Sequence, residues 1–208
     1  MKTNNLVKIA VAAALVAAPL MANAESAFTS GAGTPITANA RLDFQITIPK
    51  ILYLRVGTGS AMAANATINQ IAFSVPAANV GDGTVISATA GSGDLGNGTV
   101  TAQVIGNNGT VTFTSTTIGA LGNGAGDTIS YGQIATAAAA NTSATVLAHP
   151  TLADAATTTV TLTPAAGKVI NRDAKWTYTY ANSAVVAPGT YGGVNTNNSR
   201  VTYTASMP

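Results

Sequence analysis

Side chains that could do chemistry are few in this 208-residue chain. Acid–base and nucleophilic catalysis depend chiefly on His, Asp, Glu, Cys and activated Ser. The chain has no cysteine and one histidine, His149, which precedes Pro150 in a predicted surface loop and has Asp154 as its nearest carboxylate in sequence. The lack of cysteine excludes thiol catalysis, zinc–thiolate sites, iron–sulfur clusters and disulfides. A lone histidine builds neither a catalytic triad nor a metal site.

The seven carboxylates are scattered along the chain. Four of them lie in or beside Gly-, Asn- or small-residue turns, where aspartate is favoured for turn geometry alone: Asp82, Asp94, Asp127 and Asp154. A secreted hydrolase would need a pair of carboxyl groups that meet in space, for which Asp94, Asp127 and Asp173 are the candidates. No phosphate-binding loop, dinucleotide-binding glycine motif or nucleophile elbow occurs. We therefore predict a protein that is not an enzyme, with no catalytic residue, metal ligand or cofactor.

Residues 1–24 have the order of a secretory signal peptide. Lys2 and Lys8 are followed by an apolar run over residues 9–21, and Ala-Asn-Ala at 22–24 forms a cleavage site before Glu25. The run is shorter than the roughly 20 residues that a membrane-spanning helix needs, and we predict no transmembrane segment in the mature chain. Cleavage removes two basic side chains and leaves seven basic and seven acidic ones. A net charge of zero argues against nucleic acid as a partner and leaves little repulsion between copies.

Alternation of apolar and polar residues with period two dominates the rest of the chain and predicts strands with one buried face. It recurs at residues 42–48, 100–104, 111–113, 160–162, 176–180 and 201–205. Asn-Gly and Asp-Gly pairs at 81–84, 96–99, 107–110 and 122–124 predict tight hairpin turns. We predict an all-β protein, with a flexible leader at 25–39 and a single antiparallel β-sandwich domain at 40–208. The Ala-rich residues 135–145 are predicted to form a short helix or an irregular excursion.

Three aromatic residues, Trp176, Tyr178 and Tyr180, share one face of a predicted strand. Sugar rings stack on such aromatic faces, so the stripe could be a carbohydrate platform. Its alternation with threonine favours the core face of a strand instead.

The two ends of the predicted domain have the most specific pattern. In RLDFQITIPKILYLRV, residues 41–56, the apolar side chains alternate up to Ile48, break at Pro49-Lys50 and then resume. At the other end, GTYGG at 189–193 leads through a polar loop into an alternating strand that ends at residue 206. This pairing resembles the major subunits of chaperone–usher fimbriae, in their cysteine-free, colonisation-factor-like class. The matching residues are 44–56 and 189–206.

The resemblance implies an incomplete Ig-like sandwich that is completed by a strand donated from a neighbouring subunit. It implies donor residues at the subunit interface, namely Leu42, Phe44, Ile46 and Ile48, within a donor strand at 40–48. It places Trp176, Tyr178, Tyr180, Val201 and Tyr203 on core or acceptor strands. The implied partners are further copies of the chain, a periplasmic chaperone and an outer-membrane usher. The implied product is an adhesive or biofilm-forming filament on the surface of a Gram-negative bacterium.

A second class of function stays open at this point. A monomeric, secreted or surface-attached sandwich could bind carbohydrate or an ordered surface through its threonine-rich faces or its aromatic residues. Such a module would keep the strand at 40–48 in its own sheet.

Overall fold

The computed structural model describes residues 25–208, so the predicted signal peptide at 1–24 lies outside the described residues. The described chain divides into two units, residues 25–48 and residues 49–208. The first unit contains no helix or strand. The second contains the strands and two short 3-10 turns, η1 (Ala77–Asn79) and η2 (Tyr131–Gln133). Among residues 25–208, no helix has the length and apolarity needed to cross a membrane.

Strands make up nearly all of the regular secondary structure of residues 49–208, and the paired strands are antiparallel, which confirms the predicted all-β class. The strands are β1 (Leu52–Val56), β2 (Ile86–Ser87), β3 (Thr99–Gly106), β4 (Val111–Thr116), β5 (Leu121–Gly122), β6 (Thr128–Ile129), β7 (Ile134–Ala139), β8 (Thr157–Leu162), β9 (Ile170–Tyr180) and β10 (Thr202–Ser206). Five of the six alternating stretches after the leader fall on β3, β4, β8, β9 and β10. The sixth, at residues 42–48, forms no strand.

The larger sheet is organised around β9, the longest strand. Strands β1, β3 and β9 follow one another in the sheet. Thr177 of β9 pairs with both Thr99 of β3 and Ala137 of β7, so β3 and β7 lie on opposite edges of β9. The short β2 pairs with the end of β9. A second sheet has the order β10-β4-β8, and β5 pairs with β6 in a small hairpin.

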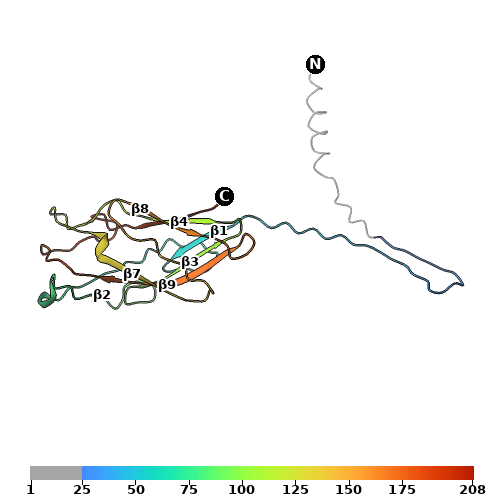
Figure 1. The fold of residues 1–208 in the computed structure, drawn as a ribbon, viewed down its shortest axis with the longest axis horizontal. Coiled ribbons are helices and arrows are strands. Elements are labelled where there is room, and N and C mark those ends of the chain that lie inside the picture. Colours follow the sequence, from blue (N-terminus) through green and yellow to red (C-terminus); the bar gives the residue numbers. More distant parts are fainter. Residues whose placement is uncertain (1–24) are drawn as a thin grey trace, which may run out of the picture. The chain divides into compact units, whose positions relative to one another are not determined.

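The two main sheets share one hydrophobic core, and Figure 1 shows β4 and β8 on one side of the domain with β7, β9 and β2 on the other. The inward side chains of β3 and β9 meet those of β4 and β8 because alternation places apolar residues on one face of each strand. Phe113 of β4 and Trp176 of β9 stack across this core with ring centroids 5.9 Å apart. The core interpretation of Trp176, Tyr178 and Tyr180 is confirmed, since all three are buried.

Two kinds of sequence prediction about local structure are wrong in part. Of the four turns expected to close hairpins, only residues 122–124 lie in one, formed by β5 and β6. Residues 81–84 and 96–99 lead into β2 and β3 without joining paired strands, and residues 107–110 connect β3 and β4, which belong to different sheets. Residues 135–145 were expected to be helical or irregular, but residues 134–139 form β7, and only residues 140–145 are irregular. The reason in the second case is tertiary, because the edge of β9 supplies a ladder of hydrogen-bond partners to an Ala-rich segment whose own propensity favours helix.

Candidate functional site

Residues 42–48 expose four large apolar side chains. The solvent-exposed fractions are 63% for Leu42, 86% for Phe44, 85% for Ile46 and 76% for Ile48. The segment was predicted to be a strand, yet it has no ladder partner within residues 25–208. Single exposed apolar residues are ordinary on protein surfaces, whereas a contiguous set marks a binding surface.

A bidentate ion pair joins the first residue of the leader, Glu25, to Arg41, just before this segment. Nε of Arg41 lies 2.6 Å from Oε2 of Glu25, and Nη2 of Arg41 lies 2.8 Å from Oε1. The Thr29 hydroxyl also donates to the Thr37 carbonyl. The hydrogen bond from Arg41 lowers the pKa of Glu25. This pair is solvent-exposed, so it adds little to stability.

In residues 49–208, two neighbouring edge strands belong to different sheets. Strand β1 ends the larger sheet and β10 ends the smaller one, and the two strands lie next to each other. In the described part of the chain, β1 pairs only with β3, and β10 only with β4. Their inward side chains pack on the core but stay partly exposed: Leu54, Val56, Val201, Tyr203, Ala205 and Met207. Each strand therefore has one edge of unpaired backbone groups beside an incompletely covered core.

Polar side chains fasten one end of these two strands. The Asn107 side chain accepts a hydrogen bond from the Ile51 backbone amide at 2.8 Å and donates one to the Pro49 carbonyl at 2.8 Å. Nζ of Lys50 and Nδ2 of Asn108 both donate to the Pro208 carbonyl, at 2.7 and 2.6 Å. The start of β1 and the residues after β10 are thus held at the turn between β3 and β4, so the two edges keep a fixed separation at this end.

An aromatic cluster lies beneath the β10 edge. Tyr203 of β10 stacks on Phe113 with centroids 6.0 Å apart and lies 5.6 Å from the ring of Trp176. The Tyr203 hydroxyl lies 3.0 Å from that of Tyr178 and 2.7 Å from Nε2 of His149. Burial raises the pKa of Tyr178 to about 12 and raises that of Tyr203 well above its ordinary value. The hydroxyl groups are therefore neutral and act as hydrogen-bonding groups within the core.

His149 is not the surface loop residue that the sequence predicted. Its ring meets Trp176 edge-on with centroids 4.6 Å apart, and its Nε2 also lies 3.1 Å from the Tyr178 hydroxyl. Burial lowers the pKa of His149 to about 4, so the imidazole is neutral at neutral pH. The buried position of His149 could not be predicted from its neighbours in sequence, because its tyrosine partners lie on strands 29 and 54 residues away.

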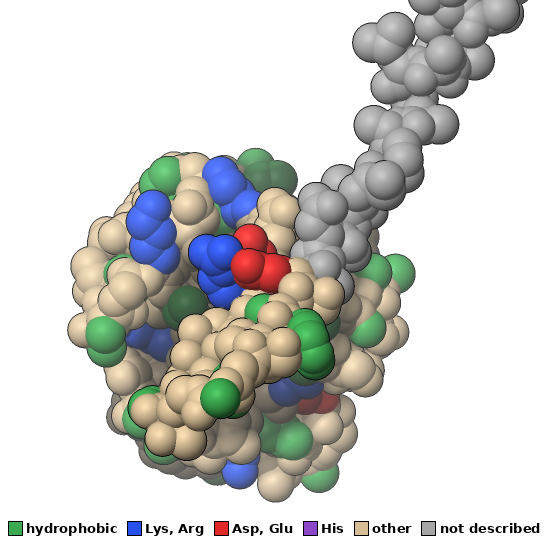
Figure 2. Space-filling model, turned by 90° about the vertical axis from the view of Figure 1, so that its right-hand side faces the viewer, with side chains coloured by type: hydrophobic (Ala, Val, Ile, Leu, Met, Phe, Trp, Pro, Cys, Tyr) green, Lys and Arg blue, Asp and Glu red, His purple; other side chains and the backbone are tan. Residues whose placement is uncertain are grey.

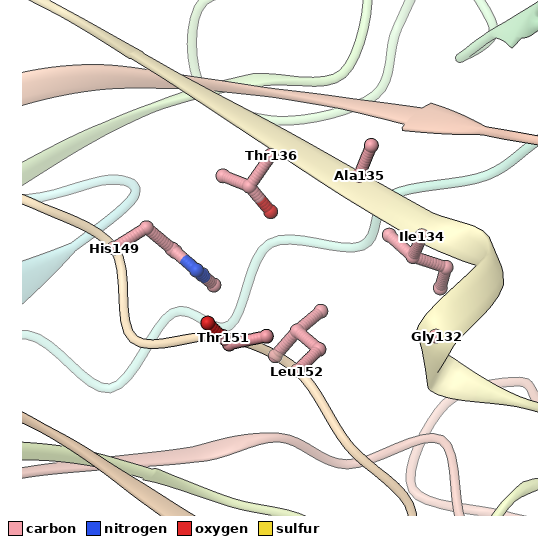
Figure 3. A pocket seen from close by; sticks show the side chains of 7 residues that line it. All are labelled: Gly132, Ile134, Ala135, Thr136, His149, Thr151 and Leu152. Atoms are coloured by element: carbon pink, nitrogen blue, oxygen red, sulfur yellow. The ribbon is translucent and has the colours of Figure 1, made fainter.

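A hollow of about 290 Å³ lies beside His149, between β7 and residues 149–152. Figure 3 shows Thr136 and Ile134 of β7 on one side, and Thr151 and Leu152 on the other. His149 is its one titratable lining residue, and its Nε2 is already bonded to two tyrosines. The hollow therefore lacks the second acid or base that hydrolysis would require.

The five aspartates of residues 49–208 accept hydrogen bonds from nearby backbone amides or side chains. Asp82 accepts from the Thr84 amide, Asp94 from the Thr101 amide and Asp154 from the Tyr131 amide. Asp127 accepts from the Asn123 side chain, and the buried Asp173 accepts several bonds from residues 141–143. Within residues 25–208, no three His, Asp or Glu side chains are grouped so that they could hold a metal ion. The candidates for hydrolysis, Asp94, Asp127 and Asp173, thus each have a structural partner of their own.

Comparisons of the chain with known protein families, with curated proteins and with solved structures found no match. The site is therefore defined by its own geometry: an exposed apolar segment at 42–48, and two open strand edges beside a partly covered core.

Proposed function

We propose that this protein is an exported structural subunit that assembles into a filament by strand donation. Residues 42–48 of one copy add to the open edges of β1 and β10 in another copy. The domain would then be an Ig-like sandwich that lacks one strand of its own. The single observation that supports this proposal most strongly is the exposure of Leu42, Phe44, Ile46 and Ile48 on an extended segment without a partner.

Apolar burial and backbone hydrogen bonding both favour binding of residues 42–48 to the open edges of β1 and β10. Burial of four large apolar side chains contributes on the order of 6–12 kcal/mol, at about 1.5–3 kcal/mol each. The unpaired backbone of β10 gains ladder hydrogen bonds at the same time, as in other cases of strand addition. A chain without cysteine has no disulfide to stabilise it outside the cell, and a donated strand provides stabilisation of another kind.

Alternation also explains why the donated strand fits a sheet edge. Even-numbered residues of 42–48 are apolar, and Asp43, Gln45 and Thr47 between them are polar. In the proposed donated strand the apolar residues would face the core of the accepting copy and the polar ones would face outward. On β10 the same period places Tyr203 and Ala205 inward and Thr202 and Thr204 outward. Both partners thus present one apolar and one polar face, which specifies the register of the pair.

The test compares two charged variants of adjacent positions. Ile46→Asp places a carboxylate on the inward face of the donated strand, where an unpaired buried charge costs several kcal/mol. Gln45→Asp places the same charge on the outward face. We expect Gln45→Asp to form filaments and a detergent-resistant ladder as the parent chain does, and Ile46→Asp to remain monomeric.

A peptide experiment separates donation from misfolding. The Ile46→Asp chain keeps its own open edges, so it should bind a peptide of residues 40–50 with the native sequence and gain thermal stability. The same peptide with Ile46→Asp should not bind. Strand donation would be ruled out if the Ile46→Asp chain forms filaments. It would also be ruled out if the parent chain is a stable monomer that does not bind the peptide.

The alternative of a carbohydrate-binding module has less support in the structure. A stacking platform needs exposed aromatic faces, and Trp176 is fully buried while Tyr178 and Tyr180 face the core. The three aromatic side chains that the sequence offered for sugar stacking thus serve packing.

A further inference from the structure

The outward face of the three-stranded sheet β10-β4-β8 is a grid of nine hydroxyl side chains. The register of the strands aligns them in three rows: Thr202–Thr116–Thr157, Thr204–Thr114–Thr159 and Ser206–Thr112–Thr161. The inward positions between them hold core residues such as Phe113 and Leu162. Seven of the nine side chains are exposed and the other two, Thr114 and Thr116, are partly buried.

The grid is regular because sheet geometry sets both of its spacings. Neighbouring strands lie about 4.8 Å apart, and residues two apart on one strand lie about 6.7 Å apart, so the face covers on the order of 300 Å². Cross-strand contacts order the side chains further, as in the 2.8 Å hydrogen bond between the hydroxyls of Thr116 and Thr157. Packing of β-branched threonines across strands keeps such a face stiff.

The chemistry of the face selects among partners. None of the nine positions is charged, so the face has no means to attract nucleic acid or an anionic surface. It has no aromatic ring for sugar stacking, because Phe113 and Tyr203 point inward from the same strands. A threonine hydroxyl both donates and accepts, so two copies of this face complement each other without charge repulsion. Residues 25–208 also have zero net charge, with seven basic and seven acidic side chains. Uncharged side chains and backbone make up most of the face drawn in Figure 2, with several Lys and Arg side chains among them.

We propose that this threonine face is a lateral contact between copies of the chain, through which neighbouring filaments associate side by side. The inference rests on the proposed assembly into filaments. A stable dimer needs about 800 Å² from each partner, and this face offers less than half of that. Isolated subunits should therefore not pair through it. A filament repeats the face along its length, so many weak contacts add up to bundling.

The test places positive charge in the middle row of the grid. Thr159→Lys combined with Thr204→Lys changes two exposed positions, one on β8 and one on β10. Asn171→Lys combined with Ala137→Lys adds the same charge at exposed positions of β9 and β7 in the other sheet and serves as the control. Filaments are recovered from cells that export each full-length chain, then compared by electron microscopy and light scattering.

We expect the parent and the control to form bundles. The middle-row variant should form single filaments of unchanged length, with light scattering lower by about threefold or more because lateral avidity is lost. Thr159→Ser combined with Thr204→Ser retains the hydroxyls and should restore bundling. If the middle-row variant fails to fold, Thr161→Lys combined with Thr202→Lys tests opposite corners of the same face.

The outcomes separate the two proposals. A parent chain that forms no filaments overturns strand donation and the lateral contact together. Parent filaments that stay single at every concentration, or lysine variants that bundle as the parent does, overturn the lateral contact alone. In a further outcome, the lysine variants bundle as the parent does but no longer bind an insoluble polysaccharide such as cellulose. That result would assign the face to carbohydrate binding and would also overturn the lateral contact.

Discussion

Nε2 of His149 lies 2.7 Å from the hydroxyl oxygen of Tyr203, and this contact connects the loop before β8 to the edge strand β10. The bond lies within the aromatic cluster of Phe113, Trp176 and Tyr178. Tyr203 is therefore positioned by a polar contact at its tip as well as by ring packing. Because β10 is the edge that we propose accepts a donated strand, the state of His149 bears on the stability of the assembly site.

Stability should fall between about pH 6.5 and pH 4 because of His149. Burial lowers the pKa of its imidazole from 6.5 to about 4, so the unfolded chain binds a proton in this range while the native chain does not. The contribution of His149 to the free energy of unfolding is fully present above about pH 6.5. It is lost as the pH falls, and the total loss is about 3 kcal/mol at most. Tyr178 and Tyr203, which face the ring, stay neutral throughout the range.

The measurement is the free energy of unfolding in urea from pH 7 to pH 5, above the range in which carboxylates titrate strongly. His149→Gln should flatten the pH dependence, at a cost of about 1–2 kcal/mol at pH 7 for the altered hydrogen bonds. If the free energy of unfolding depends on pH equally in the parent and the variant, His149 is not the cause of the pH dependence.

Asp173→Asn should destabilise the domain by about 2–3 kcal/mol at pH 7, because an ionised acceptor of several hydrogen bonds becomes neutral. Burial by itself would raise the pKa of Asp173, but hydrogen bonds from Thr142 and Ser143 outweigh it and lower the pKa below its usual value. The stabilisation is present above the unfolded pKa near 3.8 and is lost as the pH falls below it.

Urea unfolding at pH 7 checks the Asp173 prediction, and Asp127→Asn serves as the control, since Asp127 is exposed. The control should change stability by less than about 0.5 kcal/mol. Hydrogen exchange of the Thr142 and Ser143 amides should also become faster in Asp173→Asn. Unchanged protection of both amides would show that Asp173 does not hold this loop.

Gly98→Ala should cost about 2–4 kcal/mol, because it combines a left-handed backbone with a steric clash. Gly98 has a φ of +73°, and a Cβ there would lie 2.4 Å from Cβ of Ala88. Gly109 has a φ of +99° with open space around it, so Gly109→Ala isolates the backbone term at about 1–2 kcal/mol. Thermal unfolding of the two variants measures the difference, and equal losses would mean that packing at Gly98 relaxes freely.

Trp176→Phe should destabilise the domain by about 2–3 kcal/mol, through a smaller ring and an unsatisfied carbonyl. Nε1 of Trp176 donates to the Leu147 carbonyl at 2.8 Å inside the core. Trp176 is the one tryptophan of the chain, so the parent should show blue-shifted fluorescence that shifts to the red on unfolding. Red emission from the native parent would place the ring in water and contradict the core assignment.

Local patterns predicted the strands well where one face of a strand meets the core. Alternation located β3, β4, β8, β9 and β10, since period two in side-chain direction follows from backbone geometry alone. The same rule was insufficient at 42–48, where the alternation is as regular but no strand forms within the described chain. A strand needs a neighbouring strand for its backbone hydrogen bonds, and the sequence of residues 42–48 does not specify that neighbour.

The candidate site shows the same division. Sequence alone determined the alternating apolar residues Leu42, Phe44, Ile46 and Ile48, the absence of cysteine chemistry and the near-neutral charge of residues 25–208, because these depend on residue type and spacing. Only the tertiary structure decided that β1 and β10 are neighbouring open edges, that His149 lies against Trp176, and that nine hydroxyls align on one face. Each of these depends on strand order and register, which arise from contacts between residues far apart in the chain.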